Sequence, residues 1–239
     1  MAQTRDFSNP WYPCARPNPG ALRYAGISKI PKILINYLLD LPDAYGYVPI
    51  DDNSRPRVQL AKLLWHEGAR PLDQPLPTPE QKLSMLWRGE ESVLNTDAQK
   101  LAHPKGYRIF GQSFWLPAEF TAGPFLKVYM GRNLPYSEFE TEIGITLEVG
   151  VNYAQDNNMK TDAYSRIVQM EEALLNALHR VDVFGVGGIN FNRRAHMDDG
   201  SHPWHDDGTN IGRTIGISIN WQEGKNALDA VFPCDGGCG

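Results

Sequence analysis

The chain has 239 residues, of which 41% are hydrophobic and 21% charged, so it can bury a substantial core as one large domain or one and a half. Its net charge of −5 argues against an overall basic, nucleic-acid-binding surface. No apolar run approaches the roughly 18 residues of a membrane-spanning helix, and the polar, Pro-rich segment 1–19 has no signal-peptide core, so we expect a protein that stays in the cytoplasm or is built into a particle there.

Both ends of the chain are expected to act as arms. Residues 1–26 are rich in proline and show no apolar period, so this segment predicts an extended arm without a core of its own. The tail, 222–239, is rich in glycine. Aromatic side chains bury much area when they are ordered, so Trp11 and Tyr12 in the arm and Phe232 in the tail are candidate contacts with other chains.

Residues 27–106 predict a helical, Pro-rich region. An apolar stripe with spacings of three and four residues predicts a first helix over 28–41, with Ser28 as its cap and Pro42 at its end. A second short helix is expected over 57–66, because its apolar residues also fall on one face.

The stretch 70–77 separates this helix from the next one. Its repeated prolines exclude both a helix and a central strand, so it predicts a rigid linker or clamp. A third helix is expected to start at Thr78, with Pro79 in its first position and Gln81 completing a capping box. The apolar face of this helix is expected to hold Leu83, Leu86 and Trp87, and 88–106 to form a loop.

The second half of the chain predicts one α+β unit, a core domain over 107–221, in which a long amphipathic helix packs on a mostly antiparallel sheet. The expected elements are strands over 125–130, 140–153, 189–197 and 213–221, a turn at 133–135, and a helix from Thr161 or Asp162 to about residue 180. Their order is strand, strand, helix, strand, strand.

The apolar residues of these elements predict a single core. Alternation along two strands places every second side chain on one face, and the helix adds its apolar stripe. The core is expected to contain Ile145, Leu147, Val149, Leu174, Leu178, Ile215 and Ile217. The opposite strand face, with Thr214, Ser218 and Asn220, is small and polar and is expected to face another subunit or the lumen of an assembly.

The segment 195–208 is the main candidate for chemistry. It contains His196, His202 and His205 together with Asp198, Asp199, Asp206 and Asp207. Imidazole and carboxylate groups are the usual ligands of zinc, iron or manganese. The same composition is typical of a polar loop between two strands, and such a loop is a poor support for a metal site. We therefore expect no metal at 196–207, with a metal-dependent enzyme that uses this loop as the alternative.

Other motifs give no catalytic site. Gly185–Gly188 lacks the lysine of a phosphate loop and follows a helix instead of preceding one. No serine elbow occurs, no serine is placed convincingly as a nucleophile with a histidine and an acid, and Cys14 lies in the expected N-terminal arm. We expect a protein that is not an enzyme and has no cofactor.

Cysteine and arginine residues leave alternatives open. Cys234 and Cys238 suit either half of a metal or redox site or two free thiols in a flexible tail. Arg193, Arg194 and Arg213 are the dense basic positions near the predicted sheet. They are expected to pair with the nearby aspartates, with phosphate contact as the alternative, and they are candidate interface residues.

Several stretches resemble a group of tailed-bacteriophage structural proteins. They are RPLDQPLPTPEQKLSM at 70–85, KGYRIF at 105–110, KTDAYSR at 160–166 and DGTNIGRT at 207–214, and the resemblance covers about 28–221. The predicted order of elements is similar to that of tail-terminator and related head–tail joining proteins. This chain departs from the family pattern because it has an additional N-terminal region of about 100 residues. That region implies either a neck-specific extension or a different ring of the same stack, including a tail or baseplate ring.

This resemblance implies a virion protein assembled in the host cytoplasm. In that family six copies form a ring that stops growth of the tail tube, docks to the connector and lets DNA pass. The implied partners are further copies of the chain, the connector, and tail-tube or sheath proteins. DNA would pass without sequence-specific binding, and an acidic lumen would keep it from adhering to the wall.

Overall fold

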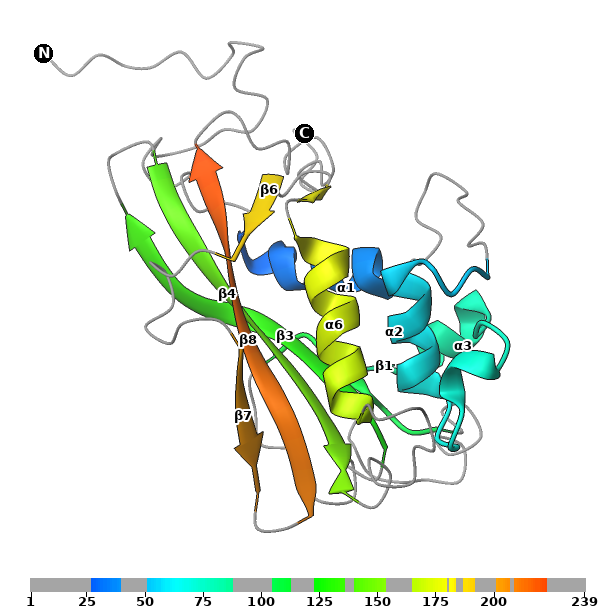
Figure 1. The fold of residues 1–239 in the computed structure, drawn as a ribbon. Coiled ribbons are helices and arrows are strands. Elements are labelled where there is room, and N and C mark those ends of the chain that lie inside the picture. Colours follow the sequence, from blue (N-terminus) through cyan, green and yellow to red (C-terminus); the bar gives the residue numbers. More distant parts are fainter. Residues whose placement is uncertain are drawn as a thin grey trace, which may run out of the picture.

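The computed structural model describes ten stretches of the chain. They are 27–39, 51–87, 105–112, 123–135, 140–153, 165–179, 181–183, 187–191, 201–206 and 209–222. These residues form a mixed α+β fold in which the helices lie on one side of a sheet (Figure 1). We call the opposite side of the sheet the far face.

The sheet has eight strands in the described part of the chain. They are β1 (Leu86–Trp87), β2 (Ile109–Phe110), β3 (Phe125–Pro135), β4 (Glu140–Asn152), β5 (Asp182–Val183), β6 (Gly187–Asn190), β7 (Ser201–His205) and β8 (Asn210–Gln222). Their order is β1-β2-β3-β4-β8-β6-β5, and β7 pairs with β8 beside β6. The pairs β1–β2 and β2–β3 are parallel, and all other pairs are antiparallel.

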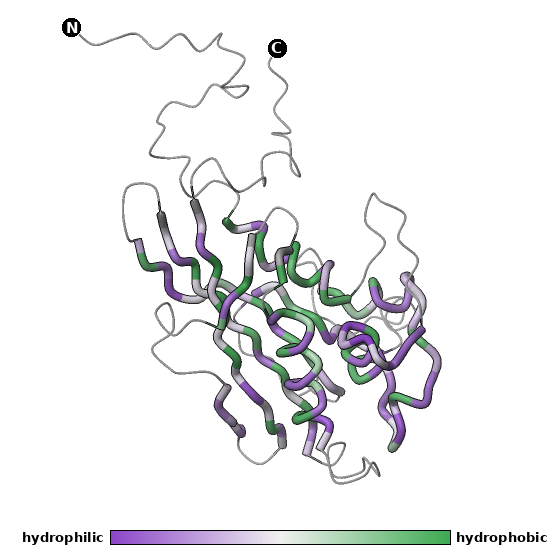
Figure 2. The backbone as a smooth tube through the Cα atoms, turned by 45° about the horizontal axis from the view of Figure 1, so that its top comes forward, coloured by the Kyte–Doolittle hydropathy of each residue, from purple (hydrophilic) through white to green (hydrophobic). Residues whose placement is uncertain are grey.

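The centre of the sheet is the ladder between β4 and β8. It runs without a shift from the Glu140–Gln222 pair to the Asn152–Asn210 pair. Every second residue therefore points to the helices. Hydrophobic and hydrophilic colours both occur along the long strands (Figure 2). All seven residues predicted for the core are fully buried in one cluster, which confirms that prediction.

The far face differs from its predicted character. Ser218 is 1% exposed and Thr146 is 8% exposed, whereas Asn220 is exposed as expected. The alternation of 140–153 predicts the inner face for Tyr153, but this residue is 54% exposed. The small polar residues of the far face are therefore not all exposed.

The helical layer contains α1 (Ile30–Leu39), α2 (Pro56–Trp65), α3 (Pro79–Ser84) and α6 (Arg166–Leu178), with 3-10 turns η2 (Ile27–Lys29) and η3 (Pro71–Asp73). Helices α1, α2 and α6 share one hydrophobic cluster with the sheet. Whether 27–106 and 107–221 are separate units stays a prediction. None of the helices in the described stretches is long and apolar enough to cross a membrane.

Tyr37 joins three of the helices. Its hydroxyl on α1 donates to the carbonyl of Ala177 on α6 at 3.1 Å. Arg57 of α2 lies over the Tyr37 ring, 4.5 Å from its centroid, and donates to the Tyr37 carbonyl at 3.2 Å. These contacts fix the three helices relative to one another on the sheet.

Residues 70–77, which we call the proline strap, run along α2. Asn53 donates to the Leu72 carbonyl at 2.8 Å, and the Nε2 atom of His66 lies 2.8 Å from the Pro75 carbonyl oxygen. Asp51 accepts from the Leu76 backbone N–H at 3.2 Å. The strap is thus held beside α2 by these bonds, and the 3-10 helix η3 within it corrects the expectation that its prolines exclude any helix.

Residues after the strap confirm one prediction and correct another. Thr78 and Gln81 form the predicted capping box, with Pro79 at the start of the helix. The helix ends at Ser84, however, and Leu83 is 38% exposed. The other two residues of its predicted apolar face form β1 instead, because strand pairing with β2 continues the sheet there.

Two further boundaries differ from the sequence prediction. The turn expected at 133–135 is part of β3, which passes through a bulge between Met130 and Asn133 and stays paired with β4. The cap of α6 is Ser165, whose hydroxyl accepts from the Val168 N–H at 3.3 Å. Thr161 and Asp162 lie outside the described residues.

Candidate functional site

The hairpin of β7 and β8 contains most of the predicted candidate residues that the structure describes. The histidines were expected in a polar loop, but 201–205 form strand β7, paired with 211–215 of β8. Strands β6 and β7 both lie along the same side of β8, because β6 pairs with Ile219 and Ser218 of that strand. The loop interpretation is therefore wrong for His202 and His205.

The two histidines point to opposite sides of the sheet. His202 pairs with Thr214 and His205 pairs with Ile211, and residues three apart in a strand face opposite ways. His202 is partly buried on the far face, whereas His205 is exposed. They cannot both bind one metal ion in this conformation.

Asp206 stabilises the turn of the hairpin. Its Oδ1 atom accepts from the backbone N–H groups of Thr209 at 3.1 Å and Asn210 at 2.6 Å, and Oδ2 accepts from the Asn210 side chain at 2.6 Å. Burial acts to raise the pKa of Asp206, but these hydrogen bonds outweigh it and lower the pKa. Both carboxylate oxygens therefore have a structural role.

Metal-binding geometry is absent from the residues that the structure describes, since no three His, Cys, Asp or Glu side chains gather there. His196, Asp198, Asp199 and Asp207 lie outside those residues, as do Cys14, Cys234 and Cys238. The prediction that 196–207 bind no metal stays a prediction.

A row of four residues crosses the far face at the hairpin. The strand register aligns Phe125 of β3, Gly150 of β4, Gly212 of β8 and Trp204 of β7. The rings of Phe125 and Trp204 meet over the two glycines, with centroids 6.0 Å apart. The glycines are required here because a Cβ atom at either position would overlap an aromatic ring.

The next row holds a polar group on the same face. Lys127 pairs with Glu148 across the strands at 2.8 Å, and the Tyr129 hydroxyl donates to the other oxygen of Glu148 at 2.7 Å. The Lys127 ammonium also lies 5.5 Å from the centroid of the Phe125 ring. Glu148 thus accepts from both Lys127 and Tyr129, which joins β3 to β4 on this face.

Gly212→Ala tests the role of this row. The new methyl group would overlap the Trp204 ring and the Val149 carbonyl oxygen, so we expect a loss of about 1–3 kcal/mol in the free energy of unfolding. Gly188→Ala is the control, because nothing lies within 4 Å of a Cβ atom there. Urea unfolding of both variants measures the difference, and equal stabilities would contradict the tight contact.

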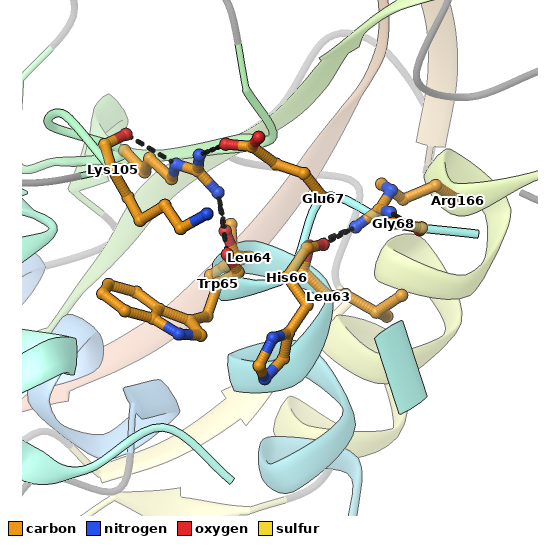
Figure 3. Close-up of polar contacts among 9 residues, drawn as sticks. Leu63, Leu64, Trp65, His66, Glu67, Gly68, Lys105 and Arg166 are labelled. Carbon is orange, nitrogen blue, oxygen red and sulfur yellow. Dashed lines mark hydrogen bonds and ion pairs between the residues drawn. The ribbon is translucent and has the colours of Figure 1, made fainter. Parts of the chain in front are cut away.

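Two buried arginines bind the backbone at the C-terminal end of α2. Arg166, at the start of α6, is fully buried and points to the C-terminal end of α2 (Figure 3). Its guanidinium donates to the carbonyls of Leu63 at 2.8 Å, His66 at 2.6 Å and Gly68 at 2.9 Å. Carbonyls at a helix end need such donors, and a positive charge is favourable there.

Arg108 caps the same helix end from the other side. It donates to the carbonyls of Leu64 at 2.5 Å and Trp65 at 3.2 Å, and it pairs with Glu67. Burial lowers the pKa of Arg108, which the charge of Glu67 opposes. The guanidinium keeps its charge, since arginine does not lose its proton in proteins. Both arginines thus hold the end of α2 in place.

The predicted interface residues divide into two groups. Trp11, Tyr12, Arg193, Arg194 and Phe232 lie outside the described residues. Arg213 lies on the helical side of β8, and its Nε atom is 3.4 Å from Glu171 of α6. This contact is with a glutamate, so the predicted pairing with nearby aspartates and the interface role of all six residues stay predictions.

Sequence reasoning missed the residues that organise these sites. The sequence pattern assigned no specific role to Arg108, Arg166, Gly150 or Gly212. One signal was present, since glycines at paired positions of two strands indicate a close approach of other groups. A comparison with protein-family models and a comparison with curated proteins both find no match to this chain.

Proposed function

We propose that this chain is a structural subunit of the phage neck, a tail terminator whose copies form a ring. The ring would cap the tail tube, join it to the head connector and let DNA pass. The observation that supports this proposal is the core of the fold, in which α6 packs on the antiparallel ladder of β3, β4 and β8. It supports the proposal because a helix packed on an antiparallel sheet is compatible with the order of elements predicted from the sequence, which resembles that of tail-terminator proteins.

The polar clusters of the described residues are consistent with a structural role. Arg108 and Arg166 bind helix carbonyls, Asp206 binds a turn, and Lys62 pairs with Asp51 at 2.5 Å beside the proline strap. Each of these charged groups is used to hold one segment against another. We infer a rigid subunit that presents surfaces instead of a catalytic centre.

Charge supports the passage of DNA in this proposal. Each copy has a net charge of −5, so a ring of copies would be strongly acidic. Like charge would keep the duplex away from the wall, and binding would not depend on sequence. The ring would contact the connector on one side and tail-tube or sheath proteins on the other.

A metal-dependent enzyme is the alternative from another class. Its ligands would come from 196–207, and the opposite directions of His202 and His205 count against it. Metal analysis of the purified protein separates the two proposals, because the enzyme requires about one bound ion per chain. A tail or baseplate ring is distinguished by its place in the particle.

Deletion of residues 1–20 tests the proposed arm. The deletion removes Trp11 and Tyr12, which we propose as contacts with a neighbouring copy, so the truncated protein should fail to reach the mass of the full-length assembly. Light scattering measures the mass, and incorporation into necks measures function. Far-UV circular dichroism should stay unchanged, which controls for folding. Normal assembly and normal joining of heads to tails would contradict the proposal.

A further inference from the structure

The edges of the sheet determine whether two copies can pair strand to strand. An open edge offers free N–H and C=O groups to another chain. In the described part of the chain, β1 and β5 are edge strands of two residues each and are too short to pair well. Two longer edges remain, the outer edge of β7 and the part of β3 beyond its pairing with β2.

The register of the hairpin shows which groups β7 turns outward. The Asp206 N–H donates to the Asn210 carbonyl at 3.1 Å, so these residues form a hydrogen-bonded pair. Hydrogen-bonded pairs alternate with non-bonded pairs along an antiparallel ladder, so the backbone groups of His202 and Trp204 also bond to β8. The backbone groups of Pro203, between them, therefore point to the outer edge. Pro203 occupies the middle of that edge and has no N–H to offer.

Pro203 is also exposed, as is His205 two residues further along. A proline within a strand is tolerated at an edge whose N–H position faces solvent, which is the position of Pro203. The outer edge of β7 therefore has a gap at its centre, where a pairing strand would need a donor.

The open part of β3 is protected by a different set of features. A bulge lies between Met130 and Asn133, which bends and twists the strand away from regular pairing. Arg132 is exposed within the bulge, and Pro135 is exposed at the end of the strand. Charge, bulge and proline are the means by which natural sheets avoid edge-to-edge pairing.

We propose that Pro203 on β7, with the bulge and Pro135 on β3, prevents copies of this chain from joining their sheets edge to edge. Self-association is thereby directed to other surfaces. This inference goes beyond the proposed ring, because it concerns the edges of the sheet and does not depend on how many copies the wild-type protein assembles. A failed ring prediction would leave it intact.

Pro203→Thr in the full-length chain tests the proposal. Threonine restores the missing N–H and favours strands, so the variant should form larger species than the wild type as the concentration rises, starting with a pairing of two copies. Light scattering over a concentration series measures the mass, and thioflavin fluorescence reports extended strand pairing. Pro75→Thr is the matched control, because Pro75 is exposed in the proline strap and lies in no strand.

Three results would overturn the proposal. The first is the same mass for Pro203→Thr and the wild type at every concentration. The second is an equal increase for Pro75→Thr, since this would be a general effect of proline loss. The third is an unfolded Pro203→Thr protein by circular dichroism, because an edge position must accept threonine.

Discussion

Arg166→Met is expected to destabilise the protein by about 3–5 kcal/mol. The guanidinium satisfies three carbonyls at the end of α2, those of Leu63, His66 and Gly68, and hydrogen bonds from charged groups contribute about 1.5–3 kcal/mol each. Methionine fills much of the volume but donates no hydrogen bond. The carbonyls would then lose these donors inside the protein, and an unsatisfied carbonyl away from water lowers the free energy of unfolding.

The control for this variant is Arg70→Met. The Arg70 side chain is 70% exposed and lies 3.8 Å from Asp73, so its loss should change the free energy of unfolding by less than about 0.5 kcal/mol. Chemical denaturation measures both values. Arg166→Lys should fall between them, because lysine keeps the charge but has no planar fork to reach three carbonyls. If Arg166→Met unfolds at the denaturant concentration of the wild type, the capping role is wrong.

Leu174→Ala is expected to cost about 2–5 kcal/mol, the range for large-to-small changes in a packed core. Leu174 is fully buried on α6 and belongs to the cluster that joins this helix to α1, α2 and the sheet. The cost reaches the upper half of this range if the surrounding residues do not move into the cavity.

Leu83→Ala is the matched control for the core variant. Leu83 is 38% exposed on the short helix α3, so the same substitution there should change stability by less than about 1 kcal/mol. Thermal unfolding of the two variants gives the comparison. Equal melting temperatures for the two would show that α6 does not pack on the core as described.

The sequence predicted the parts of the fold that depend on local pattern. Alternation in 140–153 and 213–221 was enough to identify β4 and β8, because a long period of two is typical of a strand with one buried face. Thr78 and Gln81 formed the predicted capping box since all of its groups lie within four residues. Core residues followed from the same patterns.

The parts that failed depend on distant contacts. Arg166 binds the carbonyl of Leu63, 103 residues earlier, and no local pattern indicates such a partner. The segment of β7 was interpreted as a loop because the aspartate, glycine and serine residues around it suit turns. The pairing of β7 with β8 at an edge of the sheet, where Pro203 is acceptable, is not visible in the local sequence. The meeting of Phe125 and Trp204 over two glycines likewise needs the register of four strands.

The mass of the full-length protein in solution tests the proposed ring most directly. Native mass spectrometry at micromolar concentration resolves the number of copies without a partner protein. The proposal predicts one discrete species of about six chains, since the resemblance implies a closed six-fold ring and closed symmetry limits growth. A chain that stays monomeric at every concentration would contradict it.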